Sequence, residues 1–197
     1  QLGERIPGKR ALLISGVDRY GLSHSFIEAG YDCVIGDLMF TAGVPAAIRS
    51  EEQLKRLARV LIPVMGLLPF SWLYPTGENQ EKHTPKWTRY FDWASVITGD
   101  CHYITRYMPD RLEDKVIVTN TTTPEDRQVF RQAGAKYLMT TTPVLEGRSF
   151  GTNMMEAGIV AALGRKEPVD YGHAQEYFHQ LDGLIDELQI NPSVQEL

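Results

Sequence analysis

The chain has 197 residues, a formal net charge of −5 and 43% hydrophobic residues. These values are typical of one globular domain, and without a basic run they argue against a nucleic-acid-binding surface. No apolar stretch reaches the ~18 residues of a membrane-spanning helix, so we expect no membrane span. Nothing resembles a secretory signal, and Cys33 and Cys101 are not spaced as a disulfide framework. We therefore expect a cytoplasmic protein in which both thiols are small buried hydrophobes.

The first part of the chain predicts a strand, a helix and a second strand. Residues 1–10 are polar and rich in turn-forming residues, which is typical of a linker. An apolar run at 11–14 predicts a strand, and the segment from Gly21 to Gly30 predicts a helix. A second apolar run at 33–35 ends in Gly36 and Asp37. This order is typical of a mononucleotide-binding βαβ unit.

The loop between the first strand and the helix is the predicted cofactor site. Its glycines would let the backbone turn sharply and approach a ligand, and the N–H groups of the helix would face an anion such as pyrophosphate. Asp37 lies 21 residues after Gly16, near the ~20 at which a carboxylate binds an adenosine ribose, which favours NAD over NADP. The candidate cofactor-binding residues are Gly16, Val17, Asp18, Arg19, Tyr20, Gly21, Asp37, Thr119, Thr121 and Thr141.

The same loop leaves two alternatives open. It lacks the middle glycine of the fingerprint G-x-G-x-x-G, and Asp18 adds a negative charge where a phosphate is expected, although Arg19 could compensate. The loop could therefore bind a ligand without phosphate, such as a nucleoside. It could also belong to an ordinary βαβ unit without a ligand.

A long segment separates this unit from the rest of the sheet. Ser50 is the predicted N-cap of a helix that kinks or ends near Pro63. The proline-rich segment 69–86 follows, and a segment of this kind is either a binding loop or a packed Ω-loop. The substrate-binding candidates here are Thr76 and Glu78, and the candidate proton donors are Lys82, His83 and Lys86.

Three further strands are predicted at 93–99, 115–119 and 136–140. The first of them ends at an acidic residue, Asp100, with His102 two residues later. A helix between the other two begins clearly, because Thr123 can cap it and Pro124 suits its first position.

The loop 146–153 precedes a helix of small residues at 154–163 and predicts a second anion site or a plain helix cap. Its candidate substrate-binding or anion-binding residues are Arg148, Ser149 and Asn153. The segment 171–188 predicts an amphipathic helix that packs on the body or on a second subunit, which makes a homodimer plausible.

Strands alternate with helices along most of the chain, which predicts an α/β, Rossmann-like, doubly wound and mainly parallel sheet of about five or six strands. We expect a linker at 1–10, a nucleotide-binding domain at 11–168 and a helical tail at 169–197. Ligands of such sheets bind beyond the carboxyl ends of the strands, where polar residues gather in this sequence.

Hydride transfer needs a general base or acid beside the nicotinamide. His102 is the candidate base, with the Asp100 carboxylate holding its tautomer, and Lys82 is the rival catalytic residue. No metal ligand set is expected.

Several stretches resemble a known family. VDRYG…GDLMF, PFSWLYPTGE, GD.HYI.RYMPD, TNTTT.ED and TTTP..EGRSFGTN.MEA look like bacterial and cyanobacterial proteins labelled quinate 5-dehydrogenase or shikimate dehydrogenase-like. The resemblance covers residue 9 to about residue 165. It implies the C-terminal cofactor domain of a Rossmann-fold NAD(P)-dependent oxidoreductase, in which Gly16, Gly21 and Asp37 would hold the cofactor.

Two main hypotheses follow, and a transferase that uses a nucleotide-linked donor is a third. The first is an NAD(P)-dependent dehydrogenase of a polyol or hydroxy-carboxylic acid, favoured by the polar residues at the strand ends. The second is a non-catalytic module, for example a regulatory one, that binds a nucleotide or metabolite. Asp18 favours the second, as does the lack of a match to the Lys/Asp pair of characterised shikimate and quinate dehydrogenases.

Overall fold

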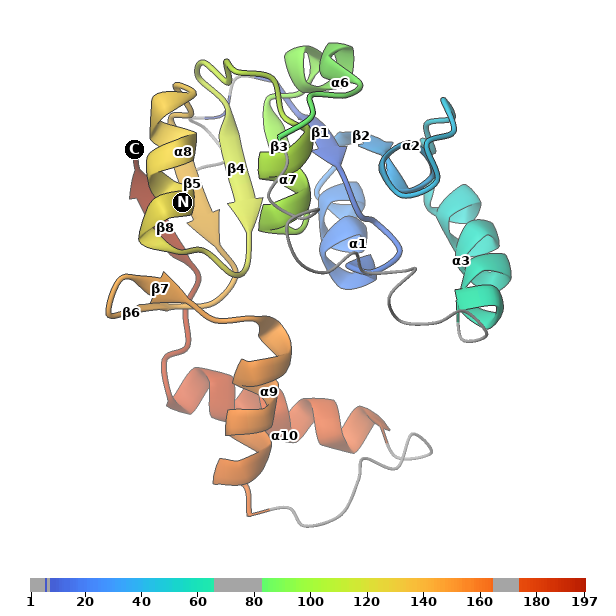
Figure 1. Ribbon diagram of the computed structural model, residues 1–197. Helices are drawn as coiled ribbons and strands as arrows, with labels where there is room; N and C mark the ends of the chain where they lie inside the picture. The colour runs from blue at the N-terminus through green and yellow to red at the C-terminus, as the bar shows by residue number, and fades with distance from the viewer. Residues whose placement is uncertain (1–5, 7, 66–82, 165–173) are drawn as a thin grey trace.

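A six-stranded sheet forms the centre of the computed structural model, which describes residue 6 and residues 8–65, 83–164 and 174–197 (Figure 1). The strands are β1 (Arg10–Leu13), β2 (Asp32–Ile35), β3 (Val96–Thr98), β4 (Val116–Thr119), β5 (Tyr137–Thr140) and β8 (Ser193–Glu196). Their order is β2-β1-β3-β4-β5-β8. The first five strands run parallel, and β8 pairs antiparallel with β5. The predicted Rossmann-like, mainly parallel α/β sheet is confirmed.

The helices of the described residues connect these strands. They are α1 (Tyr20–Glu28), α2 (Asp37–Phe40), α3 (Glu51–Met65), α6 (Thr88–Trp93), α7 (Cys101–Tyr107), α8 (Pro124–Gln132), α9 (Thr152–Ala162) and α10 (Ala174–Glu187). A small hairpin of β6 (Val144–Leu145) and β7 (Arg148–Ser149) follows β5. The strand expected at 93–99 begins only at Val96, because Trp93 ends α6. The helix expected from Ser50 continues past Pro63 to Met65.

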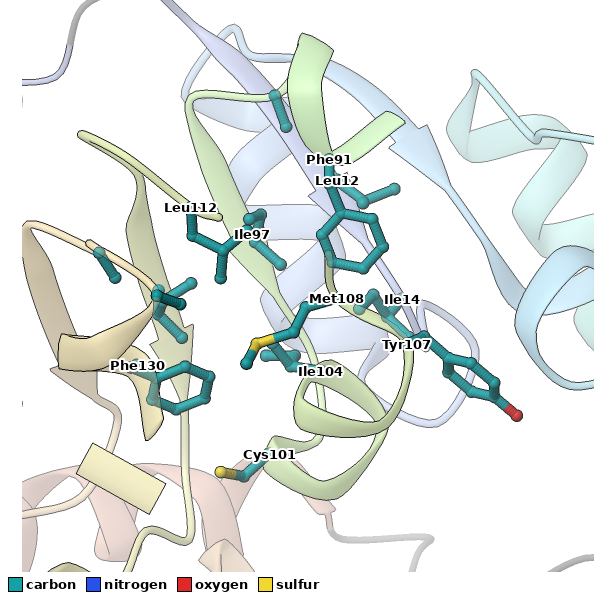
Figure 2. Close-up of a cluster of buried hydrophobic side chains, with 14 of the residues drawn as sticks. Leu12, Ile14, Phe91, Ile97, Cys101, Ile104, Tyr107, Met108, Leu112 and Phe130 are labelled. Atoms are coloured by element: carbon teal, nitrogen blue, oxygen red, sulfur yellow. The ribbon is translucent and has the colours of Figure 1, made fainter. Parts of the chain in front are cut away.

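Helices cover both faces of the sheet. Alternate residues of the strands, among them Leu12 and Ile97, pack against Phe91 of α6, Ile104 of α7 and Phe130 of α8 (Figure 2). The intervening residues form a second cluster with α1 and α3, which includes Ala11, Leu13, Val96, Val116, Val118, Phe26, Ile27, Leu54 and Leu57. Burial of each large apolar side chain contributes about 1.5–3 kcal/mol, so both layers stabilise the sheet. The sheet is therefore doubly wound, as predicted.

Helix starts follow local chemistry. Thr123 and Asp126 form a capping box at the start of α8, as the sequence predicts. Asp100 caps α7, because its carboxylate accepts the backbone N–H of His102.

Cys33 and Cys101 are buried free thiols, and burial raises the pKa of Cys33 to about 11. Both cysteines are thus small buried hydrophobes, as expected.

The C-terminal segment contains more than the predicted helix. After α10, β8 returns to the sheet beside β5, and the backbone N–H of Leu197 donates to the carbonyl of Lys136 at 3.0 Å. The sequence did not predict this strand. Its segment contains only one clearly apolar residue, Val194, among polar ones, so it lacks the apolar pattern of a buried strand. Within α10, Tyr177 is buried and Phe178 is exposed.

The strand order determines where a ligand can reach the sheet. The chain goes from β1 outward to β2 and then back to β3 on the other side of β1. In doubly wound sheets the loops diverge at such a switch point, and ligands bind there beyond the carboxyl ends of the strands. Figure 1 shows α9 and α10 on the side toward which the parallel strands point.

Candidate ligand-binding site

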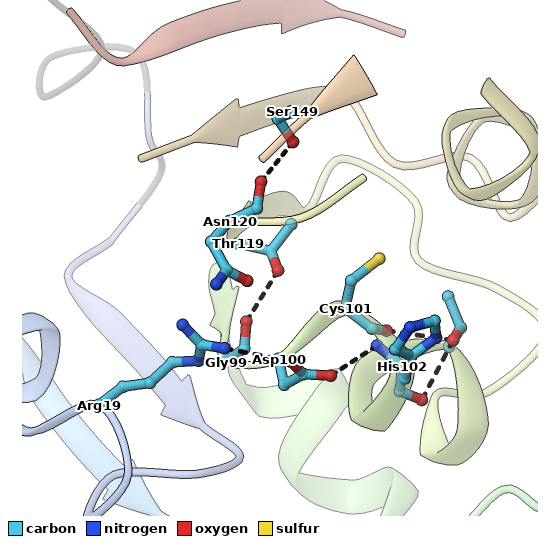
Figure 3. Close-up of polar contacts among 9 residues, drawn as sticks. Arg19, Gly99, Asp100, Cys101, His102, Thr119, Asn120 and Ser149 are labelled. Atoms are coloured by element: carbon cyan, nitrogen blue, oxygen red, sulfur yellow. Dashed lines mark hydrogen bonds and ion pairs between the residues drawn. The ribbon is translucent and has the colours of Figure 1, made fainter. Parts of the chain in front are cut away.

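The loops after β1 and β3 meet at the switch point. The Nη2 atom of Arg19 lies 3.0 Å from Oδ2 of Asp100, and both side chains are partly buried (Figure 3). Arg19 precedes the first residue of α1, and Asp100 precedes the first residue of α7. This ion pair therefore connects the two helix starts at the place where a ligand is expected.

Asp37 is bonded to the predicted cofactor loop. Its Oδ2 atom accepts the N–H of Gly16 at 2.8 Å, and its Oδ1 atom accepts the N–H of Val17 at 2.9 Å. The side chain is 7% exposed. Burial raises the pKa of the Asp37 carboxyl, while the N–H bonds from Val17 and Gly16 oppose that rise. The carboxylate that the sequence predicts to bind a ribose is thus hydrogen-bonded to the backbone of the loop.

The two loop glycines have different roles. A Cβ on Gly16 would overlap Cγ2 of Ile35 and approach Oδ2 of Asp37 to 3.1 Å, so the loop needs glycine there for its packing on β2. A Cβ on Gly21 would meet nothing within 4 Å. Gly21 therefore has open space around it, on the first turn of α1.

Buried polar atoms without partners gather at the carboxyl edge of the sheet. Within the described residues, six buried side-chain atoms have no hydrogen-bond partner, and five of them lie at or just after the ends of β1, β3, β4 and β5. These five are Ser15 Oγ, Arg19 Nε, Thr98 Oγ1, Asn120 Oδ1 and Thr141 Oγ1. The sixth is Nε of Arg106 on α7. Because five of these atoms lie along four adjacent strand ends, this edge of the sheet is where buried polar groups without hydrogen-bond partners are concentrated.

Alternation along the strands puts the polar side chains of this edge on one face. Val96 and Val118 belong to the hydrophobic cluster beneath α1 and α3. Thr98 lies two residues after Val96, and Asn120 lies two residues after Val118. The ladder continues past the strand ends, because Gly99 N–H donates to the carbonyl of Val118 at 3.3 Å. Side chains two residues apart share a face of a strand. The unpartnered Thr98 and Asn120 therefore face the same layer as α1.

Neighbouring threonines already have partners within the protein. Thr119 donates to the carbonyl of Gly99 at 2.8 Å, and Thr140 donates to the carbonyl of Thr142 at 2.7 Å. Thr119, expected to contact the cofactor, thus joins β4 to β3, whereas Thr121 is exposed. Thr141 remains available for a ligand.

The predicted catalytic residues do not form the expected arrangement. Asp100 accepts the backbone N–H of His102 rather than an imidazole N–H (Figure 3), so the carboxylate does not orient the ring. The imidazole of His102 is exposed at the start of α7. His83 contacts Thr105 and Asp110, toward the other end of α7. Lys82, Thr76 and Glu78 lie outside the described residues.

The predicted second anion loop is held by its serine. The Ser149 hydroxyl accepts the N–H of Thr122 at 2.8 Å and donates to the carbonyl of Asn120. Because that hydroxyl is buried and bonded, it does not face an incoming anion. Arg148 and Asn153 are exposed, so these two retain open surface at the start of α9.

Sequence reasoning named Thr141 but not Ser15, Thr98 or Asn120 as site residues. The available signal was a polar residue at the end of each apolar strand run.

Among the described residues, no group of three or more His, Cys, Asp or Glu side chains could hold a metal ion. No helix in the described ranges is long and apolar enough to cross a bilayer.

Comparison with known proteins identifies a family. No curated protein and no solved structure gave a significant match to the chain. The family model described as "Domain of unknown function (DUF8754)" matches residues 1–197, and the chain therefore belongs to that family.

Proposed function

We propose that the chain is a Rossmann-like module that binds a nucleotide or another small polar metabolite at the carboxyl edge of its sheet. The observation that supports this proposal is the row of buried polar atoms without partners at four adjacent strand ends. Thr98 is 1% exposed and Asn120 is 6% exposed, so bulk solvent reaches neither side chain freely.

The physical reason is the cost of an unpaired buried polar group. Each such group costs about 1–3 kcal/mol, and native proteins usually supply a protein partner, an ordered water or a ligand. Several of these costs at one edge are relieved together when a polar molecule binds there. The switch point between β1 and β3 is also where doubly wound sheets bind their ligands.

The groups at this edge indicate what the ligand offers. The hydroxyls of Ser15, Thr98 and Thr141 can donate or accept, Nε of Arg19 only donates, and Oδ1 of Asn120 accepts. Figure 3 shows the guanidinium of Arg19 and the amide of Asn120 pointing toward one another. A molecule with several hydroxyl, amide or ring-nitrogen groups matches this set.

A second proposal is the NAD(P)-dependent oxidoreductase of a hydroxy-carboxylic acid or polyol that the family resemblance implies. The observation that favours it is the exposed imidazole of His102, which lies beside Asp100 at the same edge. An exposed imidazole can exchange a proton with a substrate alcohol. The first proposal needs only the binding edge, and the second also needs turnover.

Thermal unfolding with a panel of ligands tests both proposals. The panel contains NAD, NADP, ATP, S-adenosylmethionine, nucleotide sugars, adenosine, polyols and hydroxy acids. A ligand at about 100 times its Kd stabilises the folded state by about 2.7 kcal/mol, which is easily measured as a rise in Tm.

The variant Thr98→Val removes an unpartnered hydroxyl and should reduce the ligand-induced shift to about half, while Thr119→Val is the matched control that should retain it in full. No shift with any compound would overturn the binding proposal. A shift with NAD or NADP, followed by NADH absorbance with a substrate and its loss in His102→Ala, would support the oxidoreductase.

A further inference from the structure

We infer that the carboxylate of Asp37 occupies the position in the loop after β1 at which a phosphate would otherwise bind. The ligand of this edge would then place no phosphate at that loop. The inference rests on the proposed function, because it concerns the ligand of the same edge. It makes Asp37 a residue that determines specificity.

The hydrogen bonds of Asp37 carry this inference. A phosphate at such a loop is held by the backbone N–H groups that follow the first strand. Here the N–H groups of Gly16 and Val17 both donate to the Asp37 carboxylate, at 2.8 and 2.9 Å. A carboxylate and a phosphate are both anionic acceptors, so one carboxylate with two N–H bonds satisfies the donors that a phosphate would use.

Packing keeps the loop in this arrangement. The Ser23 hydroxyl of α1 donates to the carbonyl of Gly16 at 3.1 Å and is completely buried. A Cβ at Gly16 would come within 3.2 Å of that hydroxyl and within 3.1 Å of Oδ2 of Asp37. The loop, α1 and Asp37 are thus packed together, and a phosphate could enter only by displacing the carboxylate.

Charge acts in the same direction. Asp18 is the next acidic residue in the loop, and its charge acts on the Asp37 carboxyl. Arg19, the cation that follows Asp18, is paired with Asp100 at 3.0 Å. A phosphate at the loop would therefore meet the carboxylate of Asp37, while the nearby guanidinium of Arg19 is already engaged by Asp100. Like charges at short range in a partly buried site repel strongly.

This arrangement narrows the class of ligand. A nucleoside, or another unphosphorylated metabolite with hydroxyl and amide groups, can bond to Thr98, Asn120 and Thr141 without approaching the N–H groups of Gly16 and Val17. A dinucleotide bound by its pyrophosphate in the usual way would need those N–H groups.

The test uses inorganic pyrophosphate and the amide resonances of Gly16 and Val17, so it does not depend on knowing the ligand. In the wild-type chain, millimolar pyrophosphate should leave both resonances unmoved. In Asp37→Ser the freed N–H groups should bind the anion, and both resonances should shift in a saturable way. Asp18→Asn is the matched control, because it removes a neighbouring charge but leaves Asp37 in place, and its shifts should be far smaller than those of Asp37→Ser.

Three outcomes would overturn the inference. Shifts of both resonances in the wild-type chain would show that phosphate displaces Asp37. A gain in Asp18→Asn equal to that in Asp37→Ser would show that net charge, and not occupancy, excludes the anion. If Asp37→Ser does not fold, Asp37→Ala also vacates the position, and the absence of any gain in whichever of these two variants folds contradicts the inference. A chain that excludes pyrophosphate but binds no metabolite would refute the proposed function alone.

Discussion

The guanidinium of Arg19 and the carboxylate of Asp100 lie 3.0 Å apart at the point where the chain switches from one side of β1 to the other. Asp100 uses its second oxygen to cap α7, so one carboxylate holds a neighbouring loop and a helix start. The side chains are 17% and 30% exposed, and the pair is only partly screened by solvent. This ion pair thus joins two loops of the proposed site that lie 81 residues apart in the sequence.

A double-mutant cycle on this pair should show real coupling. Arg19→Met and Asp100→Asn each leave one polar partner unpaired, while the asparagine can still cap α7. Because the pair is partly exposed, we expect a coupling energy of about 1 kcal/mol, measured by urea unfolding. The exposed pair of Arg111 and Glu113, 4.0 Å apart, is the control and should show almost none. Equal coupling in the two cycles would refute a special role for the Arg19 contact.

Substitution of the unpartnered hydroxyl should separate binding from stability. Thr98→Val removes a buried group that has no partner, so the unliganded protein should be as stable as the wild type or more stable. Thr119→Val breaks the bond to the carbonyl of Gly99 and should cost about 1–3 kcal/mol. Chemical unfolding of both variants measures the difference. If Thr98→Val were the more destabilised, its hydroxyl would have a structural partner such as an ordered water.

The sequence predicts the sheet well, because apolar runs and helix caps are local signals. The capping box at Thr123 and the strand end before Asp100 are both visible in the sequence and present in the structure. Prediction from the sequence fails where the secondary structure of a segment depends on contacts with residues far away in the sequence. Ser193–Glu196 becomes a strand only because β5 offers a free edge, and Trp93 ends a helix although it begins an apolar run.

The candidate site could be located but not resolved from sequence. Polar residues at strand ends are visible, yet Thr140 and Thr141 are neighbours of the same type, and only the fold shows that the first is bonded and the second is not. Asp37 was expected at the end of the second strand, and it lies two residues after β2, as the first residue of α2. Its bonds to Gly16 and Val17 depend on how closely that loop packs on β2, and residue spacing does not report this.

Loss of the Ser149 hydroxyl should destabilise the protein. This hydroxyl accepts the N–H of Thr122, shares a hydrogen bond with the hydroxyl of Thr122 and donates to the carbonyl of Asn120, and these groups are all buried. Ser149→Ala leaves these groups short of partners and should cost about 2–4 kcal/mol in urea unfolding. Arg148→Ala, at the exposed neighbouring position, should change stability by less than about 0.5 kcal/mol. A small effect of Ser149→Ala would mean that water replaces the hydroxyl.

Acid should weaken the contact between α1 and α3. The hydrogen bonds from Lys55 and Tyr20 lower the pKa of Glu51 to about 2 from an ordinary value of 4.5. The native state thus holds this proton less firmly than the unfolded chain, so Glu51 stabilises the fold above pH 4.5 and loses that effect as pH falls toward 2. In Lys55→Met the pKa of Glu51 should rise, as measured by NMR titration. Arg56→Met removes another cation of the same helix and should leave it unchanged.

Asp37 should give the opposite dependence on pH. Burial raises the pKa of its carboxyl above the ordinary 3.8, so the native state binds this proton more firmly than the unfolded chain. Its contribution to the free energy of unfolding is therefore complete below pH 3.8 and is lost as pH rises through the native pKa. Unfolding of the wild type and Asp37→Asn across this window should show the difference between them falling as pH rises. The exposed Asp32→Asn is the control and should not change this slope. Parallel curves for the wild type and Asp37→Asn would show that the N–H groups of Gly16 and Val17 fully offset the burial.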